Sequence, residues 1–302
     1  MTIIAFFTGQ KTMEGVFSMR IKTIMVLIVN IFVCSASMAY QVDGSLAEWG
    51  VDPGIDWIPN TSVYYWEEDS VNYANSGYVG PGYGGQPFDA EALYAAIEDS
   101  KLYISMVIGM PPQGSYPIWT QGGSPDTGAA YWYPGDLGID VNGDGMYDFG
   151  IELTGHSDNT LNGQPGNGQY TYDPSKVGNI YYVTNSNGWN TGLANFGSLP
   201  TELNYRNSSS LILVGNTSVF YVQDDTPEHY IVETSFDISF LTFTATEDIM
   251  LHWAMTCGND LADLMIPLGD IPFNPPSVVA EPASFVLICV ALWGFFITKR
   301  NG

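Results

Sequence analysis

The 302-residue sequence has few cations. It contains 8 Lys and Arg against 32 Asp and Glu, which gives a formal net charge of −24. Between Tyr40 and Ser277 there are 30 carboxylates but only Lys101, Lys176 and Arg206 as fixed cations, a formal charge of −27. Binding to nucleic acid requires a basic face, so this composition excludes a nucleic-acid partner. A carboxylate excess repels itself in a compact state, which favours bound cations or, alternatively, a role in solubility alone.

Cysteine is also scarce. Cys34 lies in an apolar segment near the start and Cys289 in one near the end, so Cys257 stands alone between them. No internal disulfide can form there, and the fold must rest on a sizeable hydrophobic core. Because no base is identifiable for Cys257, we expect a small buried thiol rather than a nucleophile.

Recognisable catalytic patterns are absent from the sequence. Its three histidines, His156, His229 and His252, have no metal-ligand spacing, and neither G-x-S-x-G nor H-E-x-x-H occurs. The run from Gly80 to Gly85 matches G-x-G-x-x-G, but it follows no convincing strand and opens no helix, so we interpret it as a loop. We expect a non-enzymatic protein. The alternative is a secreted carbohydrate-active enzyme of the glycoside hydrolase type, for which the sequence singles out no carboxylate pair.

Residues 1–39 have the features of an export signal. Met19-Arg20-Ile21-Lys22 is a short basic start, Thr23 to Val33 is apolar, and small residues follow at Ser37 and Ala39. This order predicts a signal peptide that signal peptidase cleaves after Ala39. Translation begins at Met1 or at Met19.

Residues 277–302 contain a second apolar segment, Phe285 to Thr298, followed by Lys299 and Arg300. Its roughly 14 apolar residues are fewer than the ~20 of a typical transmembrane helix. The basic end predicts that the C-terminus stays in the cytoplasm. On physical grounds this is a short C-terminal transmembrane helix that anchors the chain to the membrane.

The same tail resembles a known sorting signal. Ala280-Glu281-Pro282-Ala283, the apolar helix and Lys299-Arg300 resemble the PEP-CTERM signal, although Ala280 stands where that motif usually has its first Pro. The resemblance implies processing by a membrane exosortase. It also implies that the protein is held at the inner membrane of a Gram-negative bacterium and then displayed on the cell surface or in the extracellular biofilm matrix. Cys257-Gly258-Asn259-Asp260 resembles a segment that recurs shortly before such tails, and we can assign it no mechanism from sequence.

The region from 40 to 276 has an all-β composition. Short Val, Ile, Tyr and Phe segments alternate with Gly- and Asn-rich turns, and Asp99-Ser100 is expected to turn a hairpin. One domain with the architecture of a jelly-roll-like antiparallel β-sandwich is predicted. The expected strands are 93–98, 102–110, 136–141, 147–153, 180–184, 211–214, 219–223, 230–238 and 250–256.

The order of features in this region is similar to the exported β-sandwich superfamily that includes family 9 carbohydrate-binding modules and DOMON domains. The resemblance implies a jelly-roll-like sandwich that binds a sugar or a cofactor. The matching pieces are Val42 to Trp49, the hairpin at Asp99, Gly135 to Asp140, and Ile231 to Phe236.

The sharpest local motif matches the first nine positions of an EF-hand loop, D-x-N-x-D-G-x-x-D. Position twelve, normally a bidentate Glu, is Ile151, and the flanks have strand character, so a true EF-hand is rejected. We expect a structural calcium loop at a hairpin tip, with Asp136 or Glu152 as an extra ligand. The alternative is a solvated turn that binds no metal. The predicted ligands are the side chains of Asp140, Asn142, Asp144 and Asp148 and the carbonyl of Met146.

Aromatic residues cluster in segments that resemble loops. Exposed rings can stack on sugar faces, although large rings more often pack inside the protein. We predict that extracellular polysaccharide is the ligand of such a ring cluster; a purely structural adhesin is the alternative. The candidate ligand-binding residues are Trp119, Tyr131, Trp132 and Tyr133.

Overall fold

A computed structural model describes residues 39–68, 85–115, 132–158, 170–191, 200–224, 229–238, 248–258 and 260–267. All of them except Ala39 belong to the compact unit that begins at Tyr40. The strands are β1 (Tyr64–Glu67), β2 (Ala90–Glu98), β3 (Lys101–Ile108), β4 (Leu137–Asp140), β5 (Phe149–Ile151), β6 (His156–Asp158), β7 (Tyr170–Tyr172), β8 (Asn179–Val183), β9 (Trp189–Thr191), β10 (Pro200–Leu203), β11 (Leu211–Asn216), β12 (Val219–Gln223), β13 (Tyr230–Asp237), β14 (Ile249–Ala254) and β15 (Leu261–Ile266). The short 3-10 helices are η1 (Gln86–Phe88), η2 (Pro174–Lys176), η3 (Ser186–Gly188) and η4 (Tyr205–Ser210).

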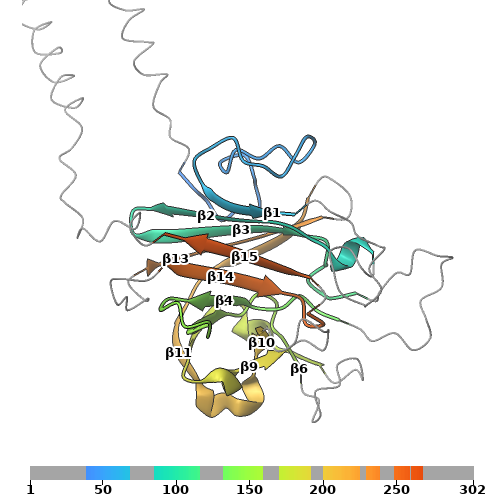
Figure 1. The fold of residues 1–302 in the computed structure, drawn as a ribbon. Coiled ribbons are helices and arrows are strands. Elements are labelled where there is room, and N and C mark those ends of the chain that lie inside the picture. Colours follow the sequence, from blue (N-terminus) through green and yellow to red (C-terminus); the bar gives the residue numbers. More distant parts are fainter. Residues whose placement is uncertain are drawn as a thin grey trace, which may run out of the picture. The chain divides into compact units, whose positions relative to one another are not determined.

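The strands form two large antiparallel sheets (Figure 1). The first has the order β1-β2-β3-β13-β12 and the second the order β11-β8-β5-β4-β14-β15, while β9 pairs with β10 and β6 with β7. The all-β prediction is therefore confirmed, and each of the nine predicted strand segments overlaps an observed strand. None of the helices in the described ranges is long and apolar enough to cross a membrane. The predicted signal peptide and the sorting residues Ala280, Glu281, Pro282, Lys299 and Arg300 lie outside those ranges.

The predicted hairpin at Asp99-Ser100 is present. Both turn residues have positive φ, 49° and 64°, and Glu98 pairs directly with Lys101. This left-handed geometry suits a two-residue turn because its twist matches the twist of the flanking strands. Polar residues with short side chains adopt it at lower cost than β-branched residues do.

One hydrophobic core joins the two sheets. Alternate residues of each strand point inward, such as Leu93 and Ile104 from the first sheet and Ile139 and Trp253 from the second. Full burial of one such aliphatic side chain contributes about 1.5–3 kcal/mol. Cys257 is buried against the same core and forms no disulfide, which confirms the expected buried thiol.

A second apolar layer covers the outer face of the first sheet. The segment after Tyr40, drawn in blue in Figure 1, lies along β2 and β3, and its Trp49 and Trp57 pack on Tyr94. Both faces of β2 are therefore buried, which explains why its sequence, AEALYAAIE, is apolar at nearly every position.

Glu233 fastens this outer layer to the sheet. Its carboxylate is 0% exposed and accepts hydrogen bonds from Trp49 Nε1 (2.9 Å), Asp43 N (2.9 Å) and Gly44 N (2.6 Å). Three donors satisfy a buried charge that has no cation beside it in these contacts. Burial still raises the pKa of Glu233 above its usual value.

We expect Trp49→Phe to lower the free energy of unfolding by about 2–4 kcal/mol, because it deletes buried ring volume and one donor to a buried carboxylate. Chemical denaturation of the full chain in detergent measures the change. Tyr65→Phe, at a position that is 44% exposed, serves as the control and should leave stability unaltered. Equal stability of the two variants would contradict the anchoring role of Trp49.

Candidate calcium loop and adjacent groove

The predicted calcium loop lies at the tip of a β-hairpin. β4 ends at Asp140, β5 begins at Phe149, and the two strands are antiparallel with Ile139 opposite Phe149. The strand character predicted for both flanks is confirmed, and with it the rejection of a helical EF-hand. The loop joins two buried strands of the second sheet, so its position is fixed by the core.

Side-chain oxygens in the first half of the loop turn inward onto backbone donors. Asp140 Oδ1 accepts from the N–H groups of Asn142 (3.0 Å) and Gly143 (2.8 Å), and Oδ2 accepts from Gly145 N (2.9 Å). Gly143 and Gly145 have φ of 71° and 81°, a conformation that glycine adopts without steric cost. Asn142 Oδ1 accepts from Asp144 N at 2.9 Å.

The second half of the loop closes on Asp148. Its Oδ2 accepts from Val141 N (3.1 Å) and its Oδ1 from Asn142 Nδ2 (3.2 Å). Burial is the main cause that raises the pKa of Asp148. Asp144 Oδ1 accepts from Met146 N at 2.8 Å, and the Met146 side chain is 51% exposed. The five predicted ligands therefore share one compact loop, in which the side-chain oxygens bond to the loop itself.

Asp136 and Glu152 do not belong to this loop, so the expectation of an extra ligand from them is wrong. Asp136 precedes β4 and Glu152 follows β5, at the end of the hairpin opposite to the tip. Asp136 accepts from Leu153 N (3.2 Å) and Leu203 N (2.8 Å). Both carboxyls are buried.

Burial raises the pKa values of both members of this pair. Burial is the largest cause that raises the pKa of Asp136, and the charge of Glu152 is the next. Burial raises the pKa of Glu152 although its carboxylate accepts hydrogen bonds, which lower the pKa, from Tyr205 Oη (2.7 Å) and Gly155 N (2.8 Å). The folded state therefore binds protons that the unfolded chain releases. The contribution of the pair to stability is lost as pH rises through the folded pKa values. It is complete only below the ordinary values of 3.8 for Asp and 4.5 for Glu.

Glu152→Gln should increase the free energy of unfolding at neutral pH by about 1 kcal/mol, because it removes a buried charge. The Gln carbonyl can still accept from Gly155 N, and its NH2 group can donate to Tyr205 Oη. Thermal denaturation of both proteins between pH 4 and 8 is the measurement. The advantage of the variant should shrink toward acid pH, where the wild-type pair becomes protonated. Parallel stability curves across this range would contradict the coupled titration.

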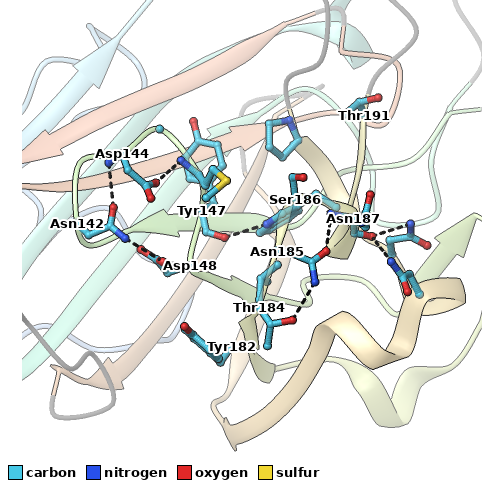
Figure 2. Close-up of a pocket in the computed structure, with 17 residues that line it drawn as sticks. Asn142, Asp144, Tyr147, Asp148, Tyr182, Thr184, Asn185, Ser186, Asn187 and Thr191 are labelled. Atoms are coloured by element: carbon cyan, nitrogen blue, oxygen red, sulfur yellow. Dashed lines mark hydrogen bonds between the residues drawn. The ribbon is translucent and has the colours of Figure 1, made fainter.

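A groove of about 800 Å³ lies beside the loop (Figure 2). One wall is the loop, including Asn142, Asp144 and Asp148, and Figure 2 shows Thr184 to Asn187 on the segment that faces it. The lining residues are Asn142, Asp144, Gly145, Met146, Tyr147, Asp148, Tyr182, Val183, Thr184, Asn185, Ser186, Asn187, Trp189, Thr191, Pro200, Asn204 and Asn207.

Aromatic packing holds the base of this groove in place. Trp189 Nε1 donates to the carbonyl of Tyr147 (3.0 Å), and the Tyr147 ring stacks on His252 with centroids 4.7 Å apart. His252 is a buried residue of β14, and its ring nitrogens contact Asp263 Oδ1 (2.6 Å) and the Pro200 carbonyl (2.8 Å). These contacts connect the loop to four strands, β9, β10, β14 and β15.

Amides and an exposed ring line the other wall. Asn185 Oδ1 accepts from Asn187 N (3.0 Å), and Asn204 Nδ2 donates to the Asn187 carbonyl (3.0 Å). These bonds fix the backbone of η3. Ser210 Oγ takes the second lone pair of Asn185 Oδ1, so the described contacts leave one lone pair of Asn204 Oδ1 and one N–H of each of the two amides for a ligand. Tyr182, from β8, is 39% exposed beside them.

Of the four aromatic residues chosen from sequence, the two that the structure describes lie outside the groove. Trp119 and Tyr131 fall outside the described residues, and Trp132 packs against the main core. Tyr133 stacks on His156 with centroids 4.4 Å apart, and burial lowers the pKa of that histidine to about 4. Neither Trp132 nor Tyr133 lines the groove, and a binding role for the four residues stays a prediction.

Sequence reasoning missed a cluster of acids at another edge of the fold. Oxygens of Glu68, Asp89 and Asp260 all lie within 4.8 Å of one another. Burial, followed by the charges of neighbouring carboxylates, raises the pKa of Asp89 to about 8, and burial raises that of Asp260 to about 7. The only sequence signal was Asp260, the last residue of the Cys257 to Asp260 segment.

No protein-family model matches this chain, and neither a curated protein nor a solved structure shows detectable similarity to it. Functional reasoning therefore rests on the residues themselves.

Proposed function

We propose that this chain is an exported, non-enzymatic β-sandwich that binds extracellular polysaccharide at the surface or in the matrix of a Gram-negative bacterium. The observation that carries the binding role is the groove of about 800 Å³ between the calcium loop and η3. It combines one exposed tyrosine ring with several amide and hydroxyl groups. Sugars present the complementary surface, because apolar C–H faces stack on rings and hydroxyls bond to amides.

Calcium has a structural role in this proposal. Asp140, Asn142, Asp144 and Asp148 supply side-chain oxygens, and Met146 supplies its carbonyl, in a loop that forms one wall of the groove. Calcium prefers six to eight oxygen ligands, and water completes such a set. Bound calcium would replace the internal hydrogen bonds of the loop as ligands for these oxygens and would stiffen the wall against which a polysaccharide rests.

The finer architecture belongs to the same proposal. We infer a jelly-roll-like sandwich related to family 9 carbohydrate-binding modules and DOMON domains. In its support, two pieces of the resemblance meet in space, since Trp49 of the opening motif bonds Glu233 of the late strand. Both residues are buried, so their contact is part of the packed domain.

Tyr182→Ala should weaken retention on the cognate polysaccharide about tenfold, since loss of one stacking ring costs about 1.4 kcal/mol. The measurement is affinity electrophoresis of the full chain in detergent across a panel of bacterial polysaccharides, with EDTA expected to weaken retention as well. Tyr65→Ala is a matched control, because Tyr65 is an exposed strand tyrosine outside the groove.

The same panel separates this proposal from its alternatives. Equal retention of the Tyr182 and Tyr65 variants would exclude the groove as the binding site. Release of reducing sugar would favour a carbohydrate-active enzyme, and absence of retention on every polysaccharide would favour a structural adhesin.

The proposed cellular location of the protein is inferred from the two ends of its sequence. We propose cleavage by signal peptidase after Ala39, transient anchoring by the C-terminal helix, and processing by exosortase at Ala280-Glu281-Pro282 before the Lys299-Arg300 end. In this scheme the acidic domain from 40 to 276 is displayed outside the cell, where calcium is available to it.

In a host with an exosortase, Pro282→Ala should shift the protein from the surface and medium fractions to the inner-membrane fraction, because the processing enzyme no longer recognises the tail. Immunoblots of fractionated cells measure the distribution, with Ser277→Ala as a control just before the motif. Identical distributions of wild type and the Pro282 variant would contradict exosortase sorting.

A further inference from the structure

Three acidic residues from two different sheets meet at one end of the sandwich. Glu68 directly follows β1, Asp89 directly precedes β2, and these antiparallel strands bring the two residues to the same end of the first sheet. Asp260 directly precedes β15 of the second sheet, and β15 packs against β1 and β2. Figure 1 shows β15 together with β1 and β2. The positions of these residues follow from the strand order and not from a flexible loop.

Their carboxylates converge closely. The oxygens lie within 4.8 Å of one another, and Asp260 is held in place because its Oδ2 accepts from Ala90 N (2.8 Å) and its Oδ1 from Leu261 N (2.8 Å). Each of these oxygens keeps a second lone pair for a ligand. The Ala90 contact also joins Asp260 to the strand that Asp89 precedes.

Asp89 supplies an independent indication that something binds here. The residue is 2% exposed, and within the described part of the chain its Oδ1 has no hydrogen-bond partner. An unpaired buried carboxylate oxygen is costly, and native proteins rarely leave one without a partner. The oxygen belongs to a carboxylate that faces those of Glu68 and Asp260.

The fixed cations of the described residues are placed elsewhere. Lys101 is opposite Glu98, at the far end of β2 from Asp89, and Lys176 lies over the Tyr205 ring at 3.6 Å. Arg206 is in η4. The nearby His229 is engaged by Glu91, with Nε2 3.0 Å from Oε1.

We propose that Glu68, Asp89 and Asp260 bind a divalent cation, calcium, which ties the two sheets together at this end of the sandwich. The site gives a physical role to the Cys257-Gly258-Asn259-Asp260 segment. This segment leads from the core to β15 and places Asp260 as a ligand of the cation. Calcium suits three carboxylates better than magnesium, because it accepts irregular all-protein oxygen sites whereas magnesium dehydrates reluctantly. This site is separate from the β4–β5 loop and does not depend on the polysaccharide groove.

The test is calcium titration by calorimetry of the full chain in detergent, after removal of metal with EDTA, together with melting temperatures in EDTA and in calcium. Asp89→Asn removes one carboxylate with little change of shape. Asp144→Asn in the β4–β5 loop is the matched control, with the same change in charge. If both sites bind, the wild type should take up about two equivalents of calcium and each variant about one less.

Melting temperatures supply a second readout. In EDTA, Asp89→Asn should melt no lower than wild type, because it relieves repulsion among the three carboxylates. In calcium it should lose the share of the wild-type rise that comes from this site, while the share from the β4–β5 loop remains. A purely structural hydrogen-bonding role would instead lower the melting temperature equally in both conditions. If Asp89→Asn does not fold, Glu68→Gln at the half-buried position gives the same comparison.

Unchanged calcium uptake in Asp89→Asn and in Glu68→Gln would overturn the proposal, and the carboxyls would then share protons instead. The prediction that the β4–β5 loop binds calcium can be wrong while the proposal for the acidic cluster holds. In that case Asp144→Asn would match wild type, while Asp89→Asn would still lose one equivalent.

Discussion

Among the described residues, the buried carboxylates of Glu233 and Asp136 are satisfied by N–H donors and not by lysine or arginine. With Lys101, Lys176 and Arg206 as its fixed cations, the described region has to satisfy buried Asp and Glu by other means. Glu233 uses an indole N–H and two backbone N–H groups, and Asp136 uses two backbone N–H groups. N–H donors thus stabilise these buried carboxylates in place of counter-ions, and each of these hydrogen bonds connects one part of the fold to another.

This constraint also accounts for where ligands are expected. In the β4–β5 loop, carboxylate and amide oxygens are held together by the loop's own N–H groups, next to a groove with the polar lining and exposed ring that sugars require. At the β1–β2–β15 edge, three carboxylates converge and a buried oxygen of Asp89 lacks a partner in the described residues. Under the proposed export the domain would meet calcium outside the cell, and a bound cation would stabilise the folded state where acidic side chains gather.

Much of the architecture was predictable because strands with two-residue periodicity leave a strong signal. The nine expected strands and the Asp99-Ser100 hairpin are present, and the β4–β5 loop lies where its motif indicated. Six strands were not predicted. Five of them, β1, β6, β7, β9 and β10, have only three or four residues each, and the sixth, β15, is interrupted by Asp263 on its outer face. The groove was missed as well, since Tyr182, Asn185 and Asn204 are distant in sequence and form no motif.

The sequence by itself determined the acidic character and the all-β class, and it carries the motifs on which the proposals of export, sorting and calcium binding rest. Each of these depends on composition or on residues within a dozen positions. Only the tertiary structure decided which acids meet. Asp136 and Glu152 proved to be a buried pair remote from the loop tip, and Glu68, Asp89 and Asp260 proved to be neighbours. Strand order and packing set these distances, and the electrostatic coupling between two carboxylates depends on their separation in space and not along the chain.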